Sequence, residues 1–288
     1  MAEANLIKVD HASPPKSLTR LIEADADILS AQLQQLRARA FAPLEQKELR
    51  RFMAGEAAKL IGISDAYLRT LVLDGVIPEA EKNSAGRRLY TLEQVHAIRD
   101  HLGRNKRDYI NRRVGDEHQQ VIAVTNFKGG SGKTTTSAHL AQYFALRGYR
   151  VLAVDLDPQA SLSALFGIQP EFDLGSNETI YGAIRYDDQQ RLISRVIRKT
   201  YFSGLDIVPG NLELQEFEHE TPRALTEGRR TADRMFFTRV AGALKGVGDD
   251  YDIVILDCPP SLGYLTLSAL CAATSVLVTI HPQMLDVA

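Results

Sequence analysis

The sequence predicts an α/β protein, with a parallel sheet covered by helices on both faces and a small helical domain before it. From about residue 118 onward, apolar segments of strand length alternate with helical segments. One strand is joined to the following helix by a glycine-rich segment. A length of 288 residues suits about two domains. We expect an N-terminal tail and helix over 1–45, a helical domain with a basic linker over 46–117, and the sheet domain over 118–288.

The composition excludes several classes of protein. Apolar residues make up 44% and charged residues 24%, as in globular domains. No apolar run reaches the roughly 18 residues of a membrane-spanning helix. The N-terminus has no signal-peptide pattern. The two cysteines, Cys258 and Cys271, form no CxxC pair, so neither a disulfide framework nor a zinc site is indicated. We expect a cytoplasmic protein with no membrane partner.

The N-terminal part predicts one helix after a polar tail. Apolar residues recur from Ser17 at spacings that place them on one helix face, and Ser17 is a candidate N-cap. The residues of this stripe are Ile22, Leu29, Leu33, Leu36 and Ala40. The stripe defines only roughly three heptads. Packing on its own domain and contact with a second copy therefore both remain open.

Residues 53–78 predict a helix, a tight turn and a second helix. Gly62 permits the turn, and Ser64 is placed to cap the second helix. A turn at 83–86, a basic strand at 87–90 and a helix begun by Thr91 follow. The inward positions of the second helix are Leu68, Leu71 and Val72, and the outward ones are Tyr67, Arg69 and Thr70.

This order resembles the winged helix-turn-helix of the MerR-like group, with the basic strand in the position of the wing. Nine basic and three acidic residues occupy 82–113, as a phosphate-facing surface requires. The resemblance implies DNA binding, with the helix in the major groove and arginines on phosphates. The residues expected to contact DNA are Ser64, Tyr67, Arg69, Arg87 and Arg88. An ordinary helical hairpin with a solvated basic face is the alternative.

The sheet domain contains five apolar segments that predict strands. They occupy 120–127, 150–157, 205–210, 251–257 and 275–281. A helix over 134–148 closes at Gly148. The intervening region 170–235 is more polar and gives no clear pattern. The acidic run at 213–220 is interpreted as a solvated helix face, and Cys271 as a core residue.

The segment 126–136 lies between a strand and a helix and predicts a P-loop, with ATP and Mg²⁺ as its ligands. Its glycines let backbone N–H groups point at phosphate oxygens, and the helix N-terminus adds its positive end. Lys133 would contact the β- and γ-phosphates, and Thr134 would offer its hydroxyl to Mg²⁺. The residues expected to bind the nucleotide are Lys128, Gly129, Gly130, Ser131, Gly132, Lys133, Thr134 and Thr135.

Three aspartates follow buried strands of this sheet. Asp155 and Asp157 end the second strand, and Asp257 ends the fourth. Carboxylates at the carboxyl ends of parallel strands point into the ligand crevice. We expect Asp257 to hold Mg²⁺ through a water. For Asp155 and Asp157 the alternative is helix capping.

The glycine-rich segment departs from the common P-loop pattern. Phe127 stands where that pattern has its first glycine, and Lys128 is an additional lysine. This resembles the deviant Walker A motif of the ParA/MinD group of ATPases, from about residue 120 to the end. The resemblance implies a P-loop NTPase fold, and a dimer in which Lys128 reaches the phosphates of the other subunit. It also implies that Asp157 positions the attacking water and that Asp155 assists the metal through water. The catalytic residues would be Lys128, Lys133 and Asp157.

The chain as a whole resembles the larger subclass of ParA-type partition ATPases that carries a DNA-binding domain. Its segment 155–187 is also similar to the RepA branch, the ParA-like proteins of repABC plasmid operons. The resemblance implies a homodimer on ATP, operator-specific and non-specific DNA binding, and a ParB/RepB-type partner that stimulates slow hydrolysis. A nucleoid-associated plasmid partition ATPase that represses its own operon is therefore expected. The alternative is a transcriptional repressor with the nucleotide as a ligand switch.

Other readings have less support. A membrane-positioning ATPase of the MinD type places a C-terminal amphipathic helix on the membrane, and the last five residues contain no such pattern. An iron–sulfur reductase is not supported either, because this chain lacks the second cysteine that the dimer-interface cluster of such proteins requires. Because the family continues beyond the strand at 275–281, we expect a C-terminal truncation with an exposed apolar edge.

Overall fold

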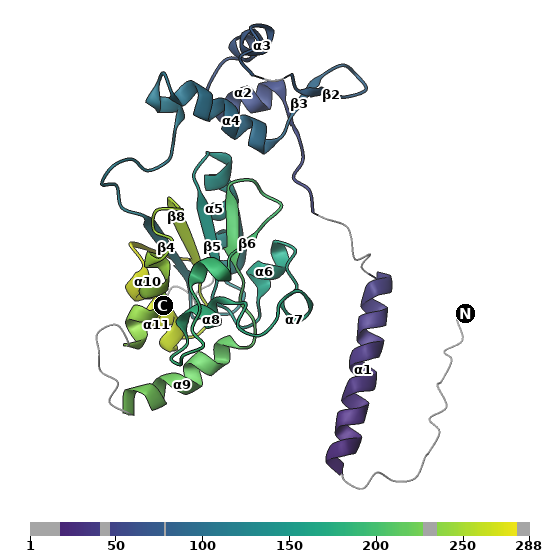
Figure 1. Ribbon diagram of the computed structural model, residues 1–288, viewed down its shortest axis with the longest axis vertical. Helices are drawn as coiled ribbons and strands as arrows, with labels where there is room; N and C mark the ends of the chain where they lie inside the picture. Colours follow the sequence, from purple (N-terminus) through teal and green to yellow (C-terminus); the bar gives the residue numbers. More distant parts are fainter. Residues whose placement is uncertain (1–17, 41–46, 78, 227–234, 281–288) are drawn as a thin grey trace, which may run out of the picture. The chain divides into compact units, whose positions relative to one another are not determined.

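The computed structural model describes residues 18–40, 47–77, 79–226 and 235–280, and contacts divide the chain into the compact units 1–46 and 47–288 (Figure 1). The first unit contains α1, Leu18–Ala40, which confirms the predicted helix. Its described stripe members, Ile22 and Leu29, are exposed. The candidate cap Ser17 and the side chains at 33–40 lie outside the described residues.

The second unit begins with the predicted pair of helices, α2 (Ala54–Ile61) and α3 (Asp65–Leu73). Gly62 ends α2 in the left-handed region, at φ +89°, which glycine adopts without strain. Ser64 Oγ accepts the Tyr67 N–H at 3.1 Å and caps α3. The predicted turn and cap are thus confirmed; of the expected inward residues, Leu68 and Leu71 are buried and Val72 is half-buried.

A three-stranded antiparallel sheet and α4 (Leu92–Gly103) complete this part. Asn83 Oδ1 accepts the N–H groups of Ala85 and Arg87, which fixes the predicted turn. Thr91 Oγ1 accepts the Gln94 N–H and caps α4. The order of the strands is β1-β3-β2, and their bounds are Phe52–Met53 for β1, Glu81–Lys82 for β2 and Arg88–Tyr90 for β3.

The remainder is built on a six-stranded sheet of order β6-β7-β5-β8-β4-β9. Every pairing is parallel except that of β6 with β7. All five predicted strands are present. The structure adds β6, which was not predicted because a strand of two residues leaves no recognisable pattern in the sequence. The strands are β4 (Gln120–Thr125), β5 (Val151–Asp155), β6 (Arg198–Lys199), β7 (Leu205–Val208), β8 (Ile253–Asp257) and β9 (Ser275–Val278).

Helices cover both faces of this sheet, which confirms the predicted architecture (Figure 1). One face packs against α5 and α6, and the other packs against α8, α9, α10 and α11. No helix within the described ranges is long and apolar enough to cross a membrane. The helices are α5 (Lys133–Leu146), α6 (Ser161–Leu165), α7 (Pro170–Asp173), α8 (Ile180–Ile184), α9 (Leu214–Thr226), α10 (Arg239–Lys245) and α11 (Tyr264–Ala272).

The α2–α4 part and the sheet share one apolar core on the α5 face. Arg99 of α4 is 4% exposed and donates both to Leu60 O of α2 and to Arg147 O, just past α5. His96 Nε2 lies 2.8 Å from Ala145 O. Because contacts place 47–288 in one compact unit, the proposed boundary at 117/118 stays a prediction.

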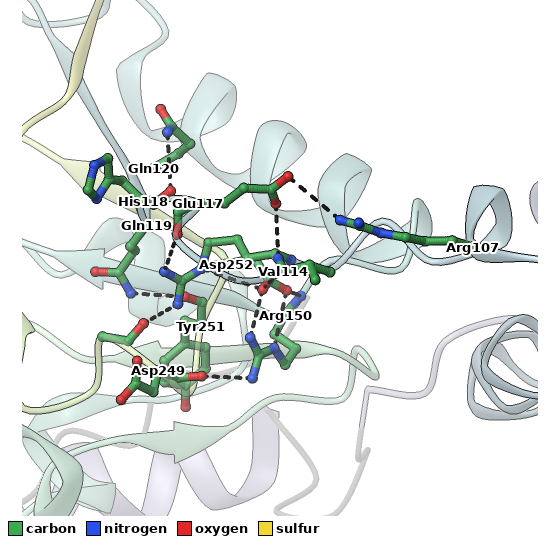
Figure 2. Close-up of polar contacts among 12 residues, drawn as sticks. Arg107, Val114, Glu117, His118, Gln119, Gln120, Arg150, Asp249, Tyr251 and Asp252 are labelled. Atoms are coloured by element: carbon green, nitrogen blue, oxygen red, sulfur yellow. Dashed lines mark hydrogen bonds and ion pairs between the residues drawn. The ribbon is translucent and has the colours of Figure 1, made fainter. Parts of the chain in front are cut away.

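The segment that leads into β4 is fixed by the buried carboxylate of Asp252 (Figure 2). Asp252 accepts the backbone N–H of Arg113 at 3.1 Å and that of Arg150 at 2.8 Å, and Arg150 Nη2 at 2.7 Å. Burial alone would raise the pKa of Asp252, but these bonds outweigh it and hold that pKa below its usual value. Gln119 Nε2 donates to Tyr251 O at 3.0 Å.

Candidate functional site

The glycine-rich segment forms a loop between β4 and α5. Gly130 (φ +77°) and Gly132 (φ +83°) occupy the left-handed region, which lets the chain curl. A Cβ at Gly129, Gly130 or Gly132 would meet no atom within 4 Å, so the loop borders open space. Since Gly132 has no side chain to cap α5, the first-turn amides of the helix remain available to a ligand.

The two lysines of the loop occupy different environments. Lys133 is only 6% exposed, and its Nζ donates to Lys128 O at 3.1 Å. Its ammonium group therefore lies against the loop itself. The Lys128 side chain is exposed, while its backbone N–H donates to Asn126 Oδ1 at 2.8 Å. Ser131 Oγ is 3.1 Å from Thr279 Oγ1, just past β9.

Asp257 combines burial with an unused oxygen. Its side chain is fully buried, and Oδ1 accepts the Ser137 hydroxyl of α5 at 2.9 Å. Oδ2 is buried and has no hydrogen-bond partner among the described residues. Burial raises the pKa of Asp257 to about 6, although the Thr134 and Ser137 hydroxyls oppose the rise. A buried, unpartnered carboxylate oxygen beside a phosphate-binding loop fits a divalent cation or its bound water.

Asp155 lies opposite Asp257 in the register of β5 and β8. Its Oδ2 accepts the Ser163 N–H at 2.8 Å and the Ser163 hydroxyl at 2.7 Å, and its Oδ1 accepts the Asp157 N–H at 3.2 Å. Burial, followed by the charge of Asp257, raises the pKa of Asp155 to about 7. Both oxygens of Asp155 thus hold the loop after β5, and its water-mediated metal role stays a prediction.

Asp157 lies two residues beyond β5 and is half-buried. Its Oδ1 accepts the Gln159 N–H at 2.9 Å, a turn bond. The chain at Gly210 packs closely against this loop, since a Cβ there would lie 2.7 Å from Asp155 O and 3.0 Å from Asp157 O. The structure therefore brings Lys133, Asp257 and the Asp155–Asp157 loop to the carboxyl edge of one sheet.

The acidic run 213–220 was expected to be a solvated face, which is confirmed for the exposed Glu216 but wrong for Glu213, Glu218 and Glu220. Glu213 accepts the Asn177 N–H, and Glu220 accepts the Tyr181 hydroxyl at 2.9 Å. Glu218 accepts two backbone N–H groups at the start of α11. These partners lie more than thirty residues away along the chain, so the local sequence pattern could not predict these contacts.

The two cysteines differ from each other. Cys271 is exposed, which contradicts its expected core position. Cys258 is buried, and burial raises the pKa of its thiol to about 12.

The expected DNA-contacting residues gather on α3 and on the hairpin. Tyr67 is 43% exposed, and Arg69 is exposed and paired with Asp65 at 2.8 Å. Ser64 is engaged as the cap of α3. Arg87 is exposed at the turn, and Arg88 is half-buried in β3. Their roles in DNA binding stay predictions.

Comparison with known proteins supports the same family. A family model described as an AAA domain matches residues 119–288. The putative replication protein A of Rhizobium rhizogenes is 57% identical over 273 residues, which span 94% of this chain and 67% of that protein. SopA of Escherichia coli K12 is 34% identical over 249 residues, 85% of this chain and 62% of SopA.

A solved structure described as a partition protein shares the fold. Its TM-score is 0.59 at 24% identity, with 88% of this chain and 71% of that chain covered. The sheet order, the loop before α5 and these relatives agree with the resemblance carried by the two lysines. The chain belongs to the ParA family of partition ATPases.

Proposed function

We propose that this protein binds and hydrolyses ATP with Mg²⁺ to partition a plasmid. The observation that carries the proposal is the pairing of an open glycine-rich loop with a buried carboxylate. Lys133 lies against the loop, and the free oxygen of Asp257 is buried on the adjacent strand. Lys133 supplies positive charge for the phosphates, and Asp257 supplies an oxygen for the cation.

The residues divide the work of phosphoryl transfer. The amides of 129–135 and the Lys133 ammonium group hold the phosphates, whose charge Mg²⁺ neutralises when bound. The Thr134 hydroxyl and, through water, Asp257 would hold the cation, with Asp155 in a water-mediated supporting role. Asp157 accepts a hydrogen bond from the attacking water and orients it. Thr135 contacts the α-phosphate.

Lys128 acts across a homodimer that forms on ATP binding. The exposure of its side chain supports this role, because an exposed lysine in the nucleotide-binding loop is accessible to a second subunit, whereas Lys133 is buried against its own loop. Lys128→Ala should still bind ATP but should neither form the closed dimer nor hydrolyse ATP. Sedimentation with ATP measures this, and an ATP-dependent dimer of wild-type strength would refute the trans role.

The partners are DNA and a ParB/RepB-type centromere-binding protein. Residues of α3 and the hairpin bind the operator, and the ATP form binds DNA without sequence preference. The partner stimulates hydrolysis and releases the protein from DNA. The cycle takes place in the cytoplasm, on the nucleoid, and operator binding represses the protein's own operon. The helix within 1–45 adds a further dimer contact.

The test is ATP hydrolysis by this chain, with and without double-stranded DNA and the centromere-binding partner. Stimulated turnover that disappears in Asp157→Ala is the expected result. Absence of turnover, with ATP-independent DNA binding intact, would leave only the DNA-binding activity.

A transcriptional repressor with a nucleotide switch is the second candidate, favoured by the exposed outer side of α3. Asp157→Ala separates the two: retained operator binding with lost plasmid retention indicates two distinct activities. Arg87→Ala combined with Arg88→Ala should weaken operator binding and leave ATP binding intact. Unchanged operator affinity in a gel-shift assay would remove the hairpin from the interface.

A further inference from the structure

We propose that Glu218 is a positioning residue for hydrolysis, which holds the loop 258–263 that follows Asp257. The inference rests on the proposed ATPase function and adds a residue that lies outside the P-loop and the strand-end aspartates. Glu218 belongs to α9, the acidic helix whose carboxylates were expected to be solvated. Its contacts show a specific structural task.

The Glu218 carboxylate caps α11. Oε2 accepts the Tyr264 N–H and Oε1 accepts the Leu265 N–H, both at 2.9 Å. These are the first two residues of the helix, where a negative charge meets the positive end of the helix dipole. A Cβ on Gly263 would lie 2.4 Å from Oε1, so the absence of a side chain at 263 is what admits the carboxylate.

The loop between Asp257 and α11 is therefore anchored at both ends. At its start, the Cys258 N–H donates to Val124 O of β4 at 3.1 Å, and Asp257 is bonded to Ser137 of α5. At its end, Glu218 fixes the first turn of α11. Pro260 and Leu262 between the anchors are exposed. Ser261 O between them accepts the Thr266 hydroxyl of α11 at 2.7 Å, so the path of the loop depends on its start and on the position of the first turns of α11.

Helix α9 also connects to the loop on the other side of the site. Four residues before α9, the Gly210 N–H donates to Ser163 Oγ at 3.1 Å, and Ser163 bonds Asp155. Phe217 of α9 is fully buried and stacks on Tyr186, with ring centroids 5.5 Å apart. Helix α9 and the residues just before it therefore contact both the loop after β5 and the loop after β8.

Loss of the Glu218 carboxylate should affect hydrolysis but not nucleotide binding. Within the described residues, no hydrogen bond or ion pair joins Glu218 to the loop at 126–136, so loss of its carboxylate leaves the groups that hold the phosphates in place. It instead frees the α11 end of the loop 258–263, and the other end of this loop adjoins Asp257, the residue proposed to hold the cation through water. Glu218 variants should therefore lower kcat while the Kd for ATP is retained.

The kinetic test compares Glu218→Ala and Glu218→Gln with Glu216→Gln, an exposed neighbour on the same helix. Partner-stimulated kcat should fall by about tenfold or more in Glu218→Ala, because small displacements of reacting groups are costly. Glu218→Gln keeps one acceptor oxygen and should recover part of the loss. Glu216→Gln should match the wild type. An unchanged kcat in Glu218→Ala, or an ATP affinity that falls in parallel with kcat, would overturn the proposal.

A second measurement does not depend on hydrolysis. In a Cys271→Ser background, Cys258 is the remaining thiol, and its burial should make maleimide labelling slow. Glu218→Ala should accelerate labelling by about tenfold or more through local opening of the loop, and Glu216→Gln should not. Equal labelling rates would show that Glu218 does not anchor the loop. If the wild-type chain lacks ATPase activity but the labelling difference is present, the proposed function fails and the anchoring stands.

Discussion

The two ends of α5 satisfy their unpaired backbone groups in opposite ways. A helix leaves N–H groups unbonded at its start and C=O groups unbonded at its end. At the start, Gly132 offers no capping side chain and the glycines border open space. At the end, the carbonyl oxygen of Ala145 contacts His96, and that of Arg147 accepts bonds from Arg99 and Asn111.

The difference indicates which end of α5 is suited to bind a ligand. The carbonyl end is occupied by side chains that come from α4 and from the segment after it, so it serves the packing of the α2–α4 part. The amide end has glycines where a capping residue would stand, so its positive partial charge is left for phosphates. The following substitutions test that assignment, from the largest expected effect to the smallest.

Lys133→Ala should abolish ATP binding. The substitution removes the ammonium group that lies against the loop, and the other lysine of the loop, Lys128, is proposed to serve the nucleotide of the second subunit. Titration calorimetry with ATP and Mg²⁺ measures the effect, and Lys128→Ala, which should retain binding, is the matched control. Tight ATP binding by Lys133→Ala would overturn the P-loop assignment.

Arg99→Ala should lower the free energy of unfolding by about 2–4 kcal/mol, because a buried side chain and its hydrogen bonds to two carbonyl oxygens are lost. Those oxygens belong to Leu60 and Arg147. Chemical denaturation gives the value. Arg112→Ala removes a half-exposed ion pair with Asp100 and should cost no more than about 1 kcal/mol. Equal losses in both variants would mean that Arg99 does not join α2 to α5.

Gly148→Ala should cost about 1–2 kcal/mol, because its φ of +90° is strained for any residue with a Cβ. The new Cβ would also lie 3.2 Å from Arg99 Nη1. Gly242→Ala, within α10 and with no atom within 4 Å of its Cβ, should be neutral or stabilising by up to about 1 kcal/mol. Thermal melting of the pair separates backbone strain from a general effect of alanine.

His96 should make a small pH-dependent contribution to stability. Burial lowers the pKa of His96 below 6.5, so the folded state binds fewer protons than the unfolded state just below that pH. Its contribution is therefore complete above about pH 6.5 and is lost as the pH falls through the lowered pKa of the folded state. Melting curves from pH 7.5 to 5.5 should be flatter for His96→Gln, while the exposed His219→Gln control should follow the wild type.

The elements near the nucleotide site could be predicted from the sequence because their signals are local. The P-loop needs glycines and a lysine within a few residues, and the strands that carry Asp155 and Asp257 are continuous apolar runs. Ser64 and Thr91 cap helices that begin directly after them. In each case the cause and the structure lie within one turn or one strand.

The errors have a common physical origin in long-range contacts. Glu218 has the sequence environment of a solvated helix residue, and only the fold brings it to α11, 46 residues later. Cys271 follows apolar neighbours in the sequence, but it is exposed near the C-terminal end of α11. The strand β6 has only two residues and owes its existence to pairing with β7.

The bonding around Asp252 has a consequence for dissecting this protein with proteases. The basic stretch 104–113 looks like a trypsin-sensitive connector, yet proteases need several residues of extended chain in their active site. Arg113 is tied through its backbone to Asp252, and the Asn111 side chain is bonded to Arg147 O (Figure 2 shows the surroundings of Asp252). Limited trypsinolysis should therefore cut this stretch slowly, and the α2–α4 part and the sheet should remain together in one fragment.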